Sequence, residues 1–243
     1  MAAMGRQVAL RALSAFVAAG LAAPGLTQAQ QQSAPELVER FQSTPVFWQQ
    51  LDIAAKIVEL RDPSVLPQIE SWLSADDRHL RGNAAFMFAG LGDRRGLEVI
   101  AAILSDRSDR GEGQGIPTGR WSLQGQIATD RYYAVHLLGE LKEAGTISIL
   151  APLMNDPQVN YKVAWALGEI GGPAAIQLLV DALNDKDSDV RVIAIESLGK
   201  LGAKETLLSL RPLLNDDEKS HFGAQVSVAE AARAAIARLE AIR

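Results

Sequence analysis

The three histidines are the first side chains to consider for chemistry, because imidazole serves both as a general base and as a metal ligand. His79, His136 and His221 lie far apart in the sequence, and none of them is followed by glutamate. The chain has no cysteine, which excludes a thiol nucleophile and a thiolate metal site. We therefore predict no catalytic residue, no metal ligand and no cofactor.

A second candidate is the glycine- and arginine-rich stretch RSDRGEGQGIPTGRWSLQGQIAT, residues 107–129. Its GEGQG segment is rich in glycine like a phosphate-binding loop, yet no strand pattern precedes it and no Lys-Ser or Lys-Thr follows it. The plain interpretation is an exposed loop. The alternative is a site for an anionic partner, since long loops on rigid scaffolds carry binding residues. Its candidate contact residues are Arg107, Arg110, Arg120 and Trp121.

Aromatic side chains form a third group, at matching places in three helical stretches. Phe86, His136 and Trp165 each stand three residues before a position that repeats along the chain. Tyr132 and Tyr161 lie one helical turn before the last two of these, on the same face. Such a face either covers a neighbouring helix or forms an exposed patch for a partner.

The repeating position is the feature that organises the chain. Each of its five occupants is followed, seventeen residues later, by aspartate. The intervals between occupants are 30, 50, 29 and 31 residues, and the long one holds the 107–129 insertion. A period of about 30 residues predicts a stacked array of repeats. The five pairs are Glu59 and Asp76, Ala89 and Asp106, Gly139 and Asp156, Gly168 and Asp185, and Gly199 and Asp216.

Each unit divides into two amphipathic helices. In the first helix, Leu138 and Leu167 stand directly before the glycine, and Ala134 shares the face of Leu138 one turn earlier. The glycine predicts a close approach of the neighbouring unit, and the aspartate is expected to cap the following helix. Second helices are expected to line the concave face, so Asp181 and Arg211 complete the candidate partner-binding residues.

The unit SDVRVIAIESLGKLGAKETLLSLRPLLND, residues 188–216, resembles the short HEAT-like repeat of the bacterial phycobilisome-lyase HEAT-like family. Arg81, Arg131 and Arg191 stand where that family has its arginine, whereas Asn160 departs from the pattern. The resemblance covers residues 45–243. It implies an all-α, right-handed α-solenoid of about five HEAT-like helix pairs plus a terminal capping helix. The HEAT-like deoxyhypusine hydroxylases carry His-Glu pairs for iron, and this sequence has none.

The N-terminus has the pattern of a secretory signal peptide. Two arginines precede an apolar run, and Thr27-Gln28-Ala29 predicts cleavage after Ala29. Residues 1–29 are therefore expected to direct the chain to the periplasm or the outside, with no stable membrane span afterwards; an uncleaved anchor is the alternative. Residues 30–44 are expected to be a polar tether with a short helix, because Ser33 and Glu36 have capping-box spacing.

The formal net charge of -5 argues against a nucleic-acid partner, since such surfaces are usually basic. We expect a non-catalytic scaffold for protein–protein interaction in the bacterial cell envelope. Its partner would be a protein or peptide bound through the concave face, the inserted loop or both. Two alternatives remain open: a lyase-like accessory enzyme using the same groove, and a structural module that assembles with itself. An exported chain would not meet a cytoplasmic phycobiliprotein, so bilin-lyase chemistry itself is not expected.

Overall fold

The computed structural model describes residues 32–108, 123–221 and 225–242. The predicted signal peptide and the loop residues Arg110, Arg120 and Trp121 lie outside the described residues.

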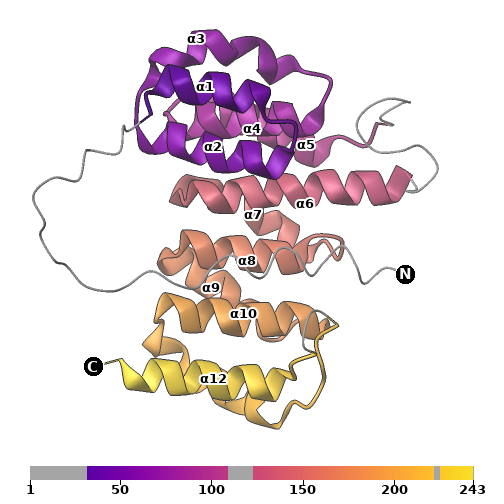
Figure 1. Ribbon diagram of the computed structural model, residues 1–243. Helices are drawn as coiled ribbons and strands as arrows, with labels where there is room; N and C mark the ends of the chain where they lie inside the picture. Colours follow the sequence, from indigo (N-terminus) through magenta and orange to yellow (C-terminus); the bar gives the residue numbers. More distant parts are fainter. Residues whose placement is uncertain (1–31, 109–122, 222–224, 243) are drawn as a thin grey trace, which may run out of the picture.

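Helices are stacked in one direction along the chain, from α1 at one end to α12 at the other (Figure 1). The predicted all-α solenoid of five helix pairs with a terminal helix is confirmed. In three of the pairs the second helix is a short α-helical turn between two 3-10 segments, so α3, α7 and α11 are brief. The bounds are α1 Ala34–Ser43, α2 Phe47–Glu59, α3 Leu66–Ile69, α4 Arg78–Gly90, α5 Arg95–Ser105, α6 Leu123–Leu141, α7 Ile147–Leu150, α8 Asn160–Ile170, α9 Gly172–Ala182, α10 Ser188–Leu201, α11 Leu207–Leu210 and α12 Val228–Ala241.

Proline explains two of the interrupted second helices. Pro152 and Pro212 each stand second in a 3-10 segment, Ala151–Asn155 and Arg211–Asn215. Proline has no N–H for the i→i−4 hydrogen bond, so the α-helical pattern fails there. The helices α5 and α9 have no proline at that place and stay regular to their ends.

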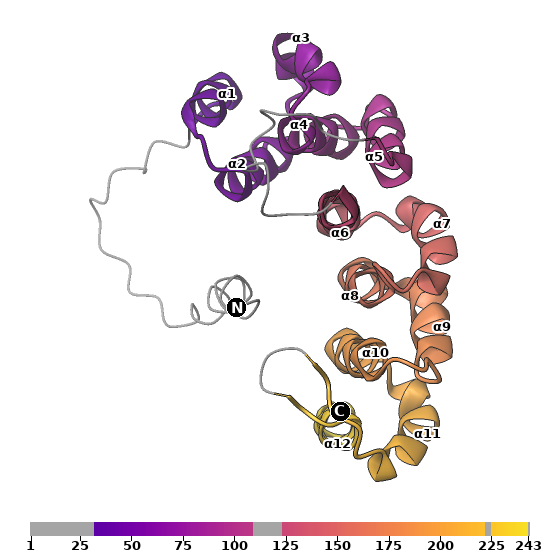
Figure 2. The same cartoon turned by 90° about the vertical axis from the view of Figure 1, so that its right-hand side faces the viewer.

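The solenoid curves with its first helices on the inside. Figure 2 shows α6, α8, α10 and α12 along the inner side of the arc, and α7, α9 and α11 along the outer side. Successive first helices touch each other directly through small residues, because a Cβ added at Gly139 would lie 3.1 Å from Ala166 Cβ and one at Gly199 would lie 3.1 Å from Ala235 Cβ. In a curved stack of helix pairs, the row whose helices are closer together lies on the inside of the curve, and here that is the row of first helices. The expectation that second helices line the concave face is therefore wrong.

Two segment boundaries differ from the sequence prediction. The short helix α1 has the expected capping box, but it is no free tether: its apolar face, including Leu37 and Phe41, is buried in the common core. The inserted loop is also shorter than the predicted 107–129, since α6 begins at Leu123.

A buried arginine joins successive units. Arg191 donates to the Asp185 carbonyl (2.7 Å) at the end of the preceding unit and to Asp216 Oδ2 (3.0 Å) at the end of its own. Asp216 Oδ1 in turn accepts from the Glu218 N–H (3.1 Å). The repeating aspartate therefore closes a turn and holds the arginine. It does not cap the helix that follows Asp185, because the N-cap of α10 is Asp187, whose carboxylate accepts from Asp189 N.

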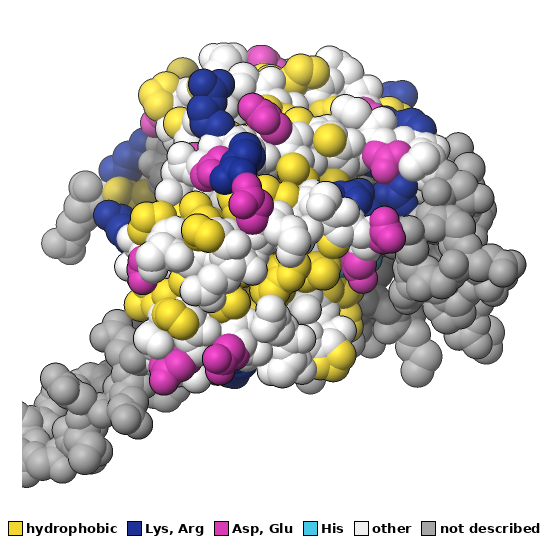
Figure 3. Space-filling view, turned by 90° about the horizontal axis from the view of Figure 1, so that it is seen from above, with side chains coloured by type: hydrophobic (Ala, Val, Ile, Leu, Met, Phe, Trp, Pro, Cys, Tyr) yellow, Lys and Arg dark blue, Asp and Glu magenta, His cyan; other side chains and the backbone are white. Residues whose placement is uncertain are grey.

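No helix in the described part of the chain is long and apolar enough to cross a membrane. Seen from the end that carries α1 and α3, basic and acidic side chains are interspersed on the surface, and neither sign forms a separate patch (Figure 3).

Candidate functional site

The inner faces of α6 and α8 bring most of the predicted aromatic residues together. The ring centroids of Tyr132 and Tyr161 are 6.1 Å apart, and those of His136 and Trp165 are 4.8 Å apart. One helical turn further on stand Glu140 and Glu169, half-buried at the same register. We call these six residues the inner strip: Tyr132, His136 and Glu140 of α6, and Tyr161, Trp165 and Glu169 of α8.

Phe86 does not belong to the inner strip, although its place in the repeat is that of His136 and Trp165. Only 3% of its surface is exposed, and it is part of the hydrophobic core. The expectation that Phe86 contacts a partner is wrong. Tyr132, by contrast, is 39% exposed.

Lys162 lies beneath the inner strip and was not among the predicted residues. Its Nζ is 3.2 Å from the centroid of the Trp165 ring and 4.8 Å from that of Tyr132, and the residue is only 7% exposed. The register of the repeat could have revealed it. The equivalent positions, six residues before the repeating one, hold Asn83, Tyr133 and Ile193, so a charged residue there is unusual.

Burial and neighbouring charges set the protonation of this region. Burial lowers the pKa of Lys162 to about 7, and the carboxylates of Glu140 and Glu169 only partly oppose that shift. Burial also lowers the pKa of His136 to about 3, with a further contribution from Lys162, so the imidazole is neutral at neutral pH. Burial and the nearby Glu169 raise the pKa of Glu140. On the rim, Glu169 Oε1 pairs with Lys200 Nζ.

The remaining predicted residues lie elsewhere. Asp181 on α9 and Arg211 after α11 are exposed on the outer side of the arc, so they cannot contact a ligand on the inner face. Arg107 is also exposed, donates to the Leu104 carbonyl (2.9 Å), and lines an open groove of about 480 Å³ with Ile149 and Leu153.

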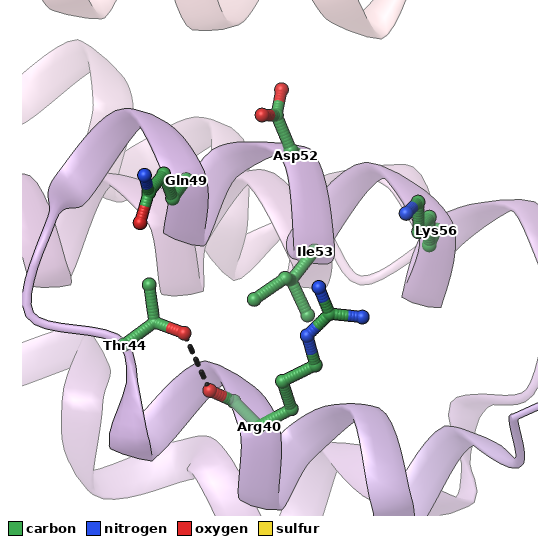
Figure 4. A pocket seen from close by; sticks show the side chains of 6 residues that line it. All are labelled: Arg40, Thr44, Gln49, Asp52, Ile53 and Lys56. Atoms are coloured by element: carbon green, nitrogen blue, oxygen red, sulfur yellow. Dashed lines mark hydrogen bonds between the residues drawn. The ribbon is translucent and has the colours of Figure 1, made fainter.

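A second open groove, of about 350 Å³, lies between α1 and α2 (Figure 4). It is lined by mixed charges, which are those of Arg40, Asp52 and Lys56. Thr44 Oγ1 donates to the Arg40 carbonyl at its base (2.8 Å). The groove contains no buried polar group without a partner, and it is unrelated to the inner strip.

One histidine approaches two carboxylates in the fold. His221 Nδ1 lies 3.3 Å from Asp189 Oδ2, and Asp187 is close enough for the three to share an ion. The carboxylates have other roles, however. Asp189 Oδ1 accepts from Ser220 Oγ (2.8 Å) and Asp187 Oδ1 accepts from Asp189 N (2.9 Å), so this cluster closes the start of α10.

The sequence family described as HEAT repeats matches residues 128–191 and 155–237. Residues 128–237 therefore carry HEAT repeats, which agrees with the helix pairs of the fold, and part of the chain is similar in sequence to a phycocyanobilin lyase subunit.

The names of two relatives refer to phycocyanin or its bilin. The chain is 26% identical over 188 residues to phycocyanin operon protein Z of Pseudanabaena tenuis, which covers 76% of this chain and 85% of that one. It is 32% identical over 113 residues to the phycocyanobilin lyase subunit alpha of Picosynechococcus, covering 39% of this chain and 42% of that one. A third, deoxyhypusine hydroxylase of Neurospora crassa, is 32% identical over 114 residues, covering 45% of this chain and 34% of that one. The chain thus spans less than half the length of the latter two.

Two solved structures align with 85% of the chain. An engineered protein gives a TM-score of 0.41 at 17% identity over 96% of its length. The complex of CpcE and CpcF of phycocyanin lyase from Nostoc gives 0.40 at 20% identity over 82%.

Proposed function

We propose that this chain is a non-catalytic interaction scaffold that binds a protein or peptide through the inner strip. The observation that supports the proposal is the alignment of half-exposed aromatic rings from two successive repeats on the inner side of the arc. Aromatic side chains supply large contact area at low entropic cost, and they are enriched where proteins bind each other. The carboxylates of Glu140 and Glu169 would favour a partner with a basic residue at that end.

Rigid spacing makes the inner strip suitable for an extended or helical partner. The rings belong to helices whose small-residue contacts fix the distance between repeats, so little order has to be gained on binding. HEAT-repeat arrays present such surfaces along their concave side.

Affinity capture from an envelope extract tests this proposal. We expect a partner held by the intact protein to be lost by the double variant Tyr132→Ala/Trp165→Ala, and retained by the control Leu208→Ala. Leu208 is 77% exposed on the outer row, so its removal changes apolar surface without touching the inner strip. A third variant lacking residues 109–122 separates the inserted loop from the strip. A partner that survives the double variant but not the loop deletion would contradict the inner strip as the binding site.

We also propose that the chain acts in the bacterial cell envelope. The support is the order of an arginine-containing start, an apolar run and the Thr27-Gln28-Ala29 site in the sequence. The expected result is a mature protein that begins at Gln30, measured by mass spectrometry of the protein purified from its own cell envelope. A protein that retains Met1 in that fraction would contradict cleavage of the signal peptide and indicate the uncleaved anchor instead, whereas a protein missing from that fraction would contradict export.

A lyase-like accessory role is the second candidate, and the similarity to a phycocyanobilin lyase subunit over 113 residues favours it. In the same capture experiment, a chain that retains added phycocyanobilin but no protein would support this role over the scaffold.

A further inference from the structure

Lys162 is a buried amine with neither a hydrogen bond nor an ion pair among the described residues. Its closest described contacts are the ring faces of Trp165 and Tyr132, which attract an ammonium but do not accept its protons as a carboxylate would. Burying a charged group without a hydrogen-bonding partner is costly. Packing gives no reason for the amine, because Ile193 fills the equivalent place in the next repeat.

The charges around Lys162 indicate what kind of ligand the amine could accept. Glu140 and Glu169 act on it from the rim of the inner strip, and Glu169 is further engaged by Lys200. Two carboxylates so placed would repel an anionic ligand. A neutral electrophile would meet no such repulsion, and a cationic product formed on the amine would be stabilised by the same two carboxylates.

We propose that Lys162 is an amine nucleophile that condenses with an aldehyde bound on the inner strip. The lone pair of Nζ adds to the carbonyl carbon, and a proton passes from nitrogen to the carbonyl oxygen. Loss of water then leaves an imine. The ring faces of Trp165 and Tyr132 suit an aromatic aldehyde, and Glu140 and Glu169 stabilise the imine when it is protonated.

The protonation of the region agrees with this geometry. Because burial lowers the pKa of Lys162 to about 7, a large fraction of the amine is neutral at neutral pH, whereas an exposed lysine has a pKa near 10.4. His136 is neutral as well and adds no positive charge to compete with the protonated imine. The activity is separate from the scaffold function, because it requires no protein partner.

Reductive trapping with benzaldehyde tests the proposal on the whole protein. The protein is treated with benzaldehyde and cyanoborohydride at pH 7, and benzylated lysines are located by peptide mapping. We expect Lys162 to be labelled at least about tenfold faster than Lys142, an exposed lysine just after α6, because burial lowers the pKa of Lys162 to about 7 and leaves a large fraction of its amine neutral. Labelling of Lys162 at or below the rate of Lys142 would overturn the proposal, since that is how a merely structural buried lysine behaves.

The pH profile adds a readout that exposure alone would not change. Labelling at Lys162 should level off above about pH 8, because its pKa is lowered to about 7, whereas labelling of an ordinary exposed lysine keeps rising towards pH 10. In Glu140→Gln the loss of a nearby negative charge should move the plateau of Lys162 to lower pH. Parallel profiles for the two lysines would also overturn the proposal.

Discussion

Replacing Arg131 with leucine is expected to lower the free energy of unfolding by about 3 kcal/mol. Arg131 is only 2% exposed, and its guanidinium binds groups from both neighbouring units. Its Nε donates to the Leu104 carbonyl (3.2 Å) at the end of α5, Nη1 to Gln158 Oε1 (3.0 Å) and Nη2 to Asp156 Oδ2 (2.5 Å). Leucine can replace the packing of this side chain but none of the three hydrogen bonds.

The size of the effect follows from the carboxylate of Asp156, which the substitution leaves without its arginine. Removing one partner of a fully buried ion pair costs about 3–5 kcal/mol, because the other charge stays buried and unpaired. Asp156 retains some contact with solvent, with 29% of its side chain exposed, so the lower end of that range applies. Its pKa, which the hydrogen bond from Arg131 lowers, should return towards the ordinary value of aspartate in the variant.

Urea unfolding followed by circular dichroism measures the change, with Arg211→Leu as the control. Arg211 is exposed and its only described ion pair, with Glu240, is long at 3.9 Å, so its loss should cost less than about 0.5 kcal/mol. Equal stabilities of the two variants would mean that Arg131 does not join the units across the inserted loop.

The repeat could be predicted from the sequence because its defining residues recur at fixed spacings along the chain. The seam leucines, the small residues of the first helices and the arginine each recur at a fixed distance from the repeating position. Where the arginine pattern is irregular, the structure compensates. Arg81 keeps only its bond to the preceding unit, to the Ala75 carbonyl, and Arg78 takes over the pairing with Asp106 (2.7 Å). A pattern that follows one repeat position cannot reveal that an arginine at another position has taken over the ion pair.

The direction of curvature could not be predicted in the same way. Each helix of a pair has an apolar seam and an outward face, and the amphipathic pattern of one helix does not say which row lies inside the arc. That depends on which row has the closer spacing between units. The burial of Phe86 is a second feature that its place in the repeat does not reveal. Both are properties of the packed array, and the placements of Asp181, Arg211 and Phe86 failed for that reason.

Lys162 shows what the repeat register can still reveal about a site. The residues that recur in every unit identify the repeat scaffold. A charged residue at a position that is otherwise uncharged, such as Lys162, marks a place where one unit differs from the others. The aromatic residues of the inner strip were found from spacing alone. The amine beneath them was missed because Tyr161-Lys162 looks like an ordinary solvent-exposed pair until the neighbouring helix is in place.

The close approach of successive first helices is expected to make Gly168→Leu the most disruptive change between two repeats. A Cβ at Gly168 would lie 2.6 Å from Ser197 Cβ and 3.3 Å from its Cα on α10, so even one carbon atom does not fit without a shift. Overpacking a tight contact costs about 1–3 kcal/mol, and a whole leucine side chain against a neighbouring backbone belongs at the upper end.

The loss of stability in Gly168→Leu has to be separated from the general effect of placing leucine in a helical turn. Gly145 provides the matched control, because a Cβ there would meet no atom within 4 Å. Gly145→Leu should therefore change the free energy of unfolding by no more than about 0.5 kcal/mol in the same urea measurement. If α10 simply moves away from α8 in the Gly168 variant, hydrogen exchange should show lost protection in both helices. A Gly168→Leu protein as stable as the Gly145→Leu control would show that glycine is not what sets the spacing of the inner row.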